Sequence, residues 1–178
     1  MRAEDYRLAR FQALIGVGRL EYPTQGGSAL PLGAHLISLR RGYLHHGIYV
    51  GNDKVVHYSG STNGLHRGPV QEIPLQRFTC GRAVWIKSRS RHDFNPSEVV
   101  RRACSRLGED RYRVFSNNCE HFCEWCLHDV HRSYQVEALL ALPSRALQVA
   151  IRFIARLVSS TMTRSVYPQQ QMAPHSKK

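Results

Sequence analysis

Residues 44–58, Leu-His-His-Gly-Ile-Tyr-Val-Gly-Asn-Asp-Lys-Val-Val-His-Tyr, decide the fold of this chain. Two short runs rich in β-branched and aromatic residues flank the segment Gly51-Asn-Asp-Lys54, which has the composition of a tight turn. This pattern predicts an antiparallel β-hairpin. Histidines occur on both predicted arms, at positions 45, 46 and 57.

The length of the turn decides which histidine of the first arm shares a face with His57. Side chains alternate between the two faces of a strand, so an odd loop count places His45 beside His57 and an even count places His46 there. The sequence leaves both registers open. We expect His46 to be a polar residue at a strand edge, facing water. Three further histidines are expected at surface or loop positions: His35, His66 and His92.

The segments around the hairpin predict an α+β fold. Short strand-like runs occur at residues 36–39, 70–73 and 83–86, and helical patterns take over after residue 94. Asn95, with Pro96 and Glu98 behind it, predicts a capped helix that stops at Gly108. A next helix begins at Asn117 or Asn118, and a short helix is expected at residues 4–15. Strands followed by helices indicate an antiparallel sheet packed against helices on one side.

Cys119 stands at the first or second position of that later helix. Backbone N–H groups in a first helical turn have no helical partner, and they favour a thiolate. The same groups could stabilise an oxyanion. The alternative is a small apolar residue at the top of a buried stripe, and spacing alone favours it because buried cysteines are common. That stripe is Cys119, Phe122, Cys123, Cys126, Leu127 and Val130.

A cysteine at a helix start, facing histidines on a sheet, is the arrangement used by thiol acyl-transfer enzymes. The pentapeptide Asn118-Cys-Glu-His-Phe122, together with residues 44–51 and 55–58, resembles the lecithin:retinol acyltransferase-like family. That family includes the H-rev107-type phospholipase/acyltransferases and falls within the NlpC/P60 papain-like superfamily. The resemblance covers residues 33–127 and implies a circularly permuted papain-like fold.

Carried over by motif, the resemblance implies a role for each matching residue. Cys119 is the nucleophile, His45 the general base and His57 the group that orients the base, which requires the odd register. Supporting positions around them are Asn118, His46 and His121. The chain departs from animal members at residues 33–37, at His45-His46-Gly47 and after the pentapeptide, so it looks more like a bacterial-type member.

The predicted function is formation of an acyl-thioester on Cys119 from a phospholipid-type ester, followed by transfer of the acyl group to an acceptor or water. An alternative is a cysteine amidase or peptidase that uses the same residues. A second alternative is a non-catalytic module that binds zinc or nucleic acid. The cysteines of the 119–128 segment repeat at helical spacing rather than as paired knuckles, which argues against zinc. Neither a metal nor a cofactor is expected.

Composition restricts the partners and the compartment. The chain has 178 residues and a formal net charge of +12, which favours anionic partners such as lipid head groups. Nucleic-acid binding would rest on charge alone and is not expected. The chain has five cysteines, an odd number crowded near residue 119, which is a poor disulfide framework. The prediction is a cytoplasmic protein, with peripheral membrane association as an option.

The C-terminal region has its own pattern. Residues 138–160 form a basic amphipathic helix after Pro143, with Arg145, Arg152 and Arg156 on one face. Such a helix suits an anionic membrane surface, although amphipathic helices usually pack on their own domain. The predicted organisation is an N-terminal helix and linker over residues 1–30, a catalytic domain over 31–135, the amphipathic helix over 136–166 and a disordered tail over 167–178.

Overall fold

The computed structural model describes residues 20–21, 30–40, 43–61, 67–87 and 93–159. The side chains of residues 20, 21, 61, 67, 145 and 153–159 are outside this description. The helix expected at residues 4–15, the tail from residue 167, and His66 and His92 also lie outside the described residues.

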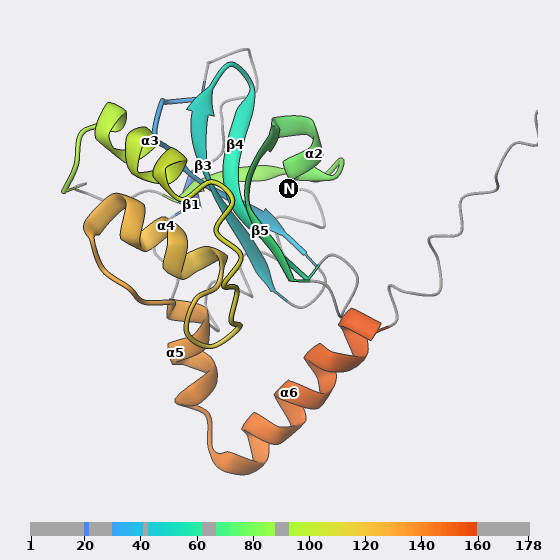
Figure 1. Cartoon of the computed structure of the whole chain (residues 1–178). Coiled ribbons are helices and arrows are strands. Elements are labelled where there is room, and N and C mark those ends of the chain that lie inside the picture. Colours follow the sequence, from blue (N-terminus) through green and yellow to red (C-terminus); the bar gives the residue numbers. More distant parts are fainter. Residues whose placement is uncertain (1–19, 22–29, 41–42, 62–66, 88–92, 160–178) are drawn as a thin grey trace, which may run out of the picture.

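The described strands form one antiparallel sheet of six strands in the order β1-β6-β2-β3-β4-β5 (Figure 1). Helices follow the strands in the chain, which confirms the α+β class. The strands are β1 (Leu20–Glu21), β2 (His35–Leu39), β3 (Leu44–Gly51), β4 (Lys54–Ser61), β5 (Arg67–Pro74) and β6 (Val84–Lys87). The helices are α2 (Leu75–Thr79), α3 (Pro96–Ser105), α4 (Cys119–His128), α5 (Tyr134–Leu140) and α6 (Ser144–Ser159).

The predicted hairpin is confirmed as β3 and β4. Asn52 and Asp53 at its tip have φ values of 49° and 52°. Two successive residues in the left-handed region match the right-handed twist of the paired strands, and asparagine and aspartate tolerate this conformation better than most residues.

Helix caps fix where α3 and α4 begin. The Asn95 side chain accepts a hydrogen bond from the Glu98 N–H at 2.9 Å, which confirms the predicted cap of α3. Asn118, not Asn117, caps α4. His121 rather than Glu120 therefore occupies the third helical position and completes the capping box. Glu120 faces the interior instead and is fully buried.

Helices cover both faces of the sheet, whereas the sequence predicted helices on one side only. Figure 1 shows α3 and α4 on one side of the β3–β4 hairpin and α2 on the other. Ile48 and Val56 pack with the residues of α3 and α4, while Tyr49 and Val55 pack with Phe78 of α2. With only five residues, α2 is too short to show a helical period in the sequence.

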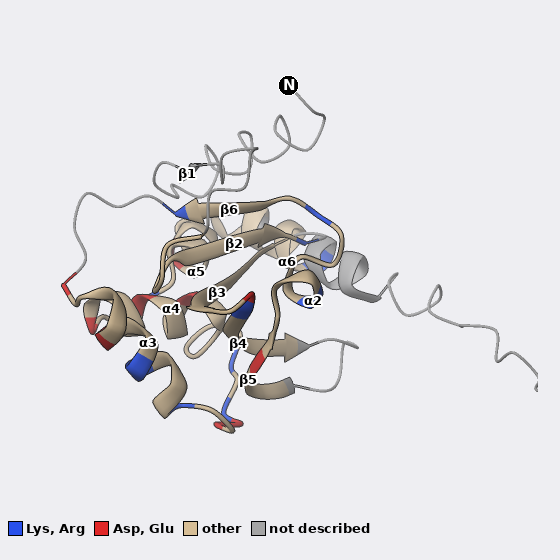
Figure 2. Ribbon diagram, turned by 90° about the horizontal axis from the view of Figure 1, so that it is seen from above, with Lys and Arg blue, Asp and Glu red and all other residues tan. Residues whose placement is uncertain are grey.

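The C-terminal helices extend beyond this core. In Figure 1, α6 extends away from the sheet. Within the described part of the chain, no helix is both long and apolar enough to cross a bilayer. Lysine and arginine are spread over several elements rather than gathered on one (Figure 2). All five cysteines are free thiols, in agreement with the predicted lack of a disulfide framework.

Candidate active site

A register shift in the hairpin places His45 and His57 on one face of the sheet. Tyr49 pairs with Val55, and the turn closes at Gly51 and Lys54, with an irregularity between the two pairs. Residues 50–54 therefore separate the paired Tyr49 and Val55, an odd count. The histidine rings meet as a result, with His45 Nε2 2.8 Å from His57 Nδ1. This is the register that the assignment of His45 requires.

Phe78 of α2 supports this histidine pair. Its ring stacks on His45 at 5.2 Å between centroids and meets His57 edge-on at 5.8 Å. Gly47 allows this approach, because a Cβ at that position would lie 2.8 Å from Phe78 Cε2 and 2.6 Å from Val55 Cγ1. Arg40 holds α2 in place by donating hydrogen bonds to the carbonyl oxygens of Phe78 and Thr79.

The hydrogen-bond partners of the pair fit two sets of tautomers, and one of them leaves a lone pair on His45 Nδ1. If His45 carries its proton on Nε2, that N–H donates to His57 Nδ1. His57 then carries its own proton on Nε2, which lies 3.4 Å from the side-chain amide of Gln71. Because amide nitrogen and oxygen are assigned from the network, Gln71 can turn its oxygen to this N–H. His45 Nδ1 then has a lone pair and can act as a base.

The Cys119 sulfur lies at a break between β3 and β4. The ladder between them runs from Gly51–Lys54 to Ile48–Val56, while β4 remains paired with β5 as far as Ser61. The backbone of residues 44–46 on the β4 side is thereby left open, and we call it the open edge of β3. Cys119 Sγ lies 4.0 Å from Leu44 O and also interacts with the N–H of His46. The sulfur therefore lies beside the backbone of residue 45.

Burial keeps both partners neutral before reaction. Burial raises the pKa of Cys119 to about 12, although the N–H groups of His46, Cys119 and Glu120 act in the opposite direction. Burial, with neighbouring His57 and Arg40, holds the pKa of His45 well below its usual value. Burial also lowers the pKa of His57 to about 4. The expectation of a resting thiolate is therefore wrong, because desolvation outweighs the helix terminus.

The N-terminus of α4 retains one candidate oxyanion donor. The Asn118 side-chain oxygen accepts the N–H groups of Glu120 at 2.9 Å and His121 at 3.1 Å. The Asn118 N–H donates to His121 Nδ1 at 3.3 Å. Capping therefore uses the N–H groups of Glu120 and His121, which the sequence offered as possible oxyanion donors. The N–H of Cys119 is not used for capping. Asn118 and His121 both lie at the first turn of α4, beside Cys119.

His46 is wholly buried, not at a water-facing edge, and His35 is buried rather than on the surface. Both predictions are wrong because the face of the sheet beneath α4 continues under α5. His46 Nδ1 lies 2.8 Å from His35 Nε2, which forms a second imidazole pair. On its other side, His46 Nε2 lies 2.9 Å from Gln135 Nε2.

Gln135 of α5 clamps the open edge of β3. Its side-chain oxygen accepts the Leu44 N–H at 2.8 Å, and its nitrogen donates to the Leu44 oxygen at 3.2 Å. These bonds replace the pairing that β4 gives up there. The clamp therefore fixes the carbonyl that the Cys119 sulfur contacts.

A buried charge cluster anchors α4 beneath this edge. Lys87 Nζ lies 2.8 Å from Glu124 Oε1 and 3.4 Å from Glu120 Oε1, and all three side chains are at most 2% exposed. Burial opposes ionisation of Glu120, but His46, Lys87 and the hydrogen bonds from Ser133 and Gln135 lower its pKa to about 2. Pairing of this kind is what makes buried charges tolerable.

Sequence analysis missed five residues around the site: Gln71, Phe78, Lys87, Glu124 and Gln135. None belongs to a motif, and all except Glu124 are distant from Cys119 along the chain. The capped helix start was the only local signal. Among the described residues, no group of three or more histidine, cysteine or acidic side chains is placed to hold a metal ion.

The comparison with known families agrees with this geometry. The model for lecithin retinol acyltransferase matches residues 28–132, which is more than half of the chain. This chain belongs to the lecithin retinol acyltransferase family. Membership supports a thiol acyltransferase or phospholipase type of activity in general. No curated protein sequence matches the chain. Ser133 and Gln135 lie just beyond the matched region, so α5 adds to the site from outside it.

Proposed function

We propose that the chain is an acyltransferase or phospholipase that forms an acyl-thioester on Cys119. Three observations support this proposal: family membership, the 2.8 Å contact between His45 and His57, and the Cys119 sulfur beside the backbone of residue 45. The imidazole contact carries the proposal, because it gives a second histidine to His45, the residue whose backbone lies beside the Cys119 sulfur.

The reaction begins with two neutral groups. As the sulfur attacks the ester carbonyl of the donor, His45 Nδ1 takes the thiol proton and the imidazolium is stabilised through His57. The Cys119 N–H is the closest backbone donor for the developing oxyanion. Collapse of the intermediate breaks the ester C–O bond, and His45 returns its proton to the departing alcohol. A thioester remains on Cys119.

Transfer of the acyl group repeats these steps in reverse. An acceptor amine, alcohol or water attacks the thioester carbonyl while His45 removes the acceptor's proton. The thiolate leaves and regains that proton from His45, so the enzyme is restored. The same residues serve hydrolysis and transfer, and the acceptor admitted to the site decides between them.

Intact-mass measurement tests the proposal. After incubation with a short-chain phosphatidylcholine, wild type should gain the mass of one acyl group and lose it on treatment with hydroxylamine. Cys119→Ser should gain no hydroxylamine-labile mass. A matched amide substrate offered in parallel tests the amidase alternative. Equal labelling of wild type and Cys119→Ser would refute a thioester at this position.

We also propose that α6 lies on an anionic membrane surface. Val149 is 68% exposed, and Ala146, one helical turn before it, is also exposed. Arg152 is exposed as well. The core thus leaves these positions uncovered, which favours a lipid surface over packing within the chain. Val149→Glu should reduce co-sedimentation with vesicles containing phosphatidylglycerol while helix content is unchanged. Full binding by the variant would contradict this role.

A further inference from the structure

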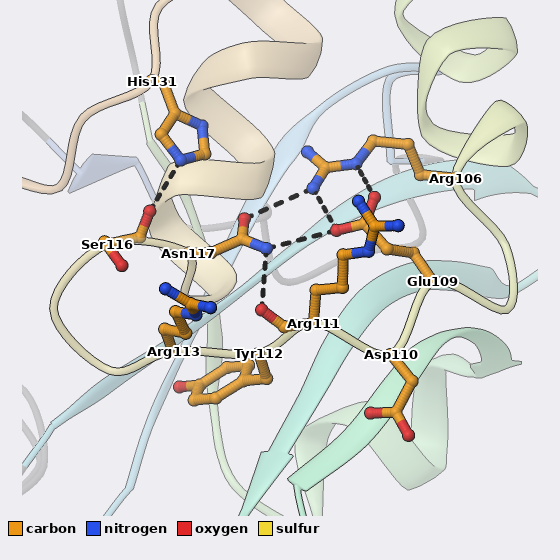
Figure 3. Close-up of a pocket in the computed structure, with 9 residues that line it drawn as sticks. All are labelled: Arg106, Glu109, Asp110, Arg111, Tyr112, Arg113, Ser116, Asn117 and His131. Atoms are coloured by element: carbon orange, nitrogen blue, oxygen red, sulfur yellow. Dashed lines mark hydrogen bonds and ion pairs between the residues drawn. The ribbon is translucent and has the colours of Figure 1, made fainter.

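A cavity of about 820 Å³ lies beside the start of α4, outside the histidine pair (Figure 3). Three arginines, Arg106, Arg111 and Arg113, contribute to its wall together with Asn117. Asn117 immediately precedes the cap residue of α4. The wall of the cavity therefore continues directly into the turn that contains Cys119.

The arginines of this cavity are not equivalent. Arg106 donates two hydrogen bonds to Glu109, at 2.6 and 2.7 Å, and this pairing holds the pKa of Glu109 at about 2. Arg111 and Arg113 have no ion pair among the residues that the structure describes. Figure 3 shows the carboxylate of Asp110 directed away from the other side chains. Arg111 and Arg113 thus lack an ion-pair partner among the described residues, and the cavity wall keeps more arginines than carboxylates even when Asp110 is counted.

Hydrogen bonds of the loop fix the backbone at Arg111 and Arg113. Between them, Tyr112 turns inward and packs on Tyr58 at 5.2 Å and against Gly60. The Arg111 N–H donates to Tyr58 Oη at 2.7 Å, and the Arg113 N–H donates to Asn117 O at 3.0 Å. Arg111 and Arg113 are exposed and line the cavity together with Tyr112.

The two residues after Arg113 form an apolar tip of the loop. Val114 and Phe115 are each 51% exposed, and the Val114 oxygen accepts a hydrogen bond from the Asn118 side chain at 2.8 Å. Two exposed apolar side chains beside two unpaired guanidinium groups match the boundary of a lipid layer, where phosphate lies above the acyl chains. A free phosphate or a nucleic acid would not account for the apolar tip.

We propose that this cavity binds the phosphate of a membrane phospholipid through Arg111 and Arg113, while Val114 and Phe115 enter the acyl region. Guanidinium groups recognise phosphate by charge-assisted hydrogen bonds. The inference rests on the proposed function, because the phosphorus of a glycerophospholipid is only a few bonds from its nearer ester carbonyl. A donor held by its phosphate would present that ester to Cys119.

The kinetic test compares two soluble donors with the same acyl chains, a short-chain phosphatidylcholine and the corresponding diacylglycerol without phosphate. Arg111→Gln/Arg113→Gln should raise KM for the phospholipid about tenfold or more and leave turnover of the diacylglycerol unchanged. Arg111→Lys/Arg113→Lys should recover part of the loss. Arg77→Gln/Arg101→Gln removes the same charge from α2 and α3 and should behave as wild type. Equal effects on both donors, or no effect on either, would overturn the proposal.

A binding test separates this proposal from the proposed function. Cys119→Ser protein is mixed with phosphatidylcholine vesicles containing phosphatidic acid, with and without inorganic phosphate. Binding should fall severalfold when Arg111 and Arg113 are replaced and should resist millimolar inorganic phosphate. Release of the protein by inorganic phosphate would contradict a lipid site. If no thioester ever forms but vesicle binding depends on the arginines, the proposed function fails and the phosphate site stands.

Discussion

Two imidazole pairs with the same 2.8 Å contact lie on opposite faces of β3, and they differ in what terminates each of them. The first pair, His45 and His57, ends at the neutral amide of Gln71 and at the edge where Cys119 lies. The second pair, His35 and His46, ends at Gln135 and at Glu124, whose Oε1 is 3.8 Å from His35 Nδ1.

Under the proposed function, this difference makes the first pair the proton-transfer pair and the second a structural one. Gln135 must direct its oxygen to the Leu44 N–H, so its nitrogen donates to His46 Nε2. His46 then donates to His35, and His35 has its remaining N–H directed at a carboxylate. Every proton in this second pair is assigned by a fixed partner. In the first pair, the Gln71 amide can present either its oxygen or its nitrogen to His57, so His45 Nδ1 can keep a lone pair.

The largest expected effect is on the rate of thioester formation, when His45 is replaced and the adjacent His46 is replaced separately for comparison. His45→Asn should slow thioester formation by about 10²–10⁴-fold, because asparagine cannot accept the thiol proton. His46→Asn should keep the rate within about tenfold of wild type but destabilise the fold by about 1–3 kcal/mol. Single-turnover mass spectrometry and urea unfolding measure the two quantities. Equal rate losses in both variants would remove the distinction.

The charge cluster on the α4 side should dominate stability. Lys87→Met leaves Glu120 and Glu124 buried without their cation and should lower the free energy of unfolding by about 3–5 kcal/mol. The exposed pair of Lys54 and Glu72 provides the control, because a solvent-exposed ion pair contributes little and Lys54→Met should change stability far less. Urea denaturation compares them. A loss below that of the control would show that the cluster contributes little.

Gln71 and Gln135, which end the two histidine pairs, should also differ in their effects on rate and stability. Gln135→Ala leaves the N–H and C=O of Leu44 without their partner and should destabilise the fold by about 1–3 kcal/mol. Gln71→Ala should change stability by less than about 1 kcal/mol, yet should lower the rate because His57 loses the group that fixes its tautomer. A destabilised Gln71→Ala variant with full activity would reverse these assignments.

The pH dependence follows from the lowered pKa values of the buried histidines. Folded His46 and His57 have pKa values of about 4, below the usual 6.5, because burial disfavours the imidazolium. The unfolded chain therefore takes up protons first as pH falls. Stability should be lost between pH 6.5 and 4, by up to about 1.4 kcal/mol per group and pH unit.

Activity should respond to the same shift. Thioester formation needs neutral His45, so its rate should persist as pH falls through 6.5 and decline only at lower pH. Rate measurements over pH 4–8 with unfolding controls test both expectations. A rate that halves at pH 6.5, or a stability that stays constant between pH 7 and 5, would contradict the burial argument.

The sequence predicted those features of the fold that depend on neighbouring residues. The turn Gly51-Asn-Asp-Lys54 identified the hairpin, and Asn95 marked the start of α3, because turn and cap chemistry depend on neighbouring residues. The parity that pairs His45 with His57 stayed open, since it depends on an irregularity between Tyr49 and Gly51 that has no residue signature. The pentapeptide identified Cys119 through resemblance, whereas spacing alone favoured a core residue.

The remaining errors concern burial and long-range contact. His46 looked like an exposed polar residue because nothing near it indicates that Gln135, far along the chain, would cover it. Glu120 looked like a capping residue, but one position of shift in the cap directs it at Lys87 instead. The resting state of Cys119 was mispredicted for the same reason, because a helix start reveals nearby donors but not the extent of desolvation.

Peptide mapping of the acylated protein tests the central claim most directly. After reaction with short-chain phosphatidylcholine, digestion at low pH should recover the acyl group on the peptide that contains Cys119. It should be absent from the peptide of Cys80, which is an exposed thiol and the most accessible competitor. An acyl group on Cys80, or on a residue other than cysteine, would contradict the account.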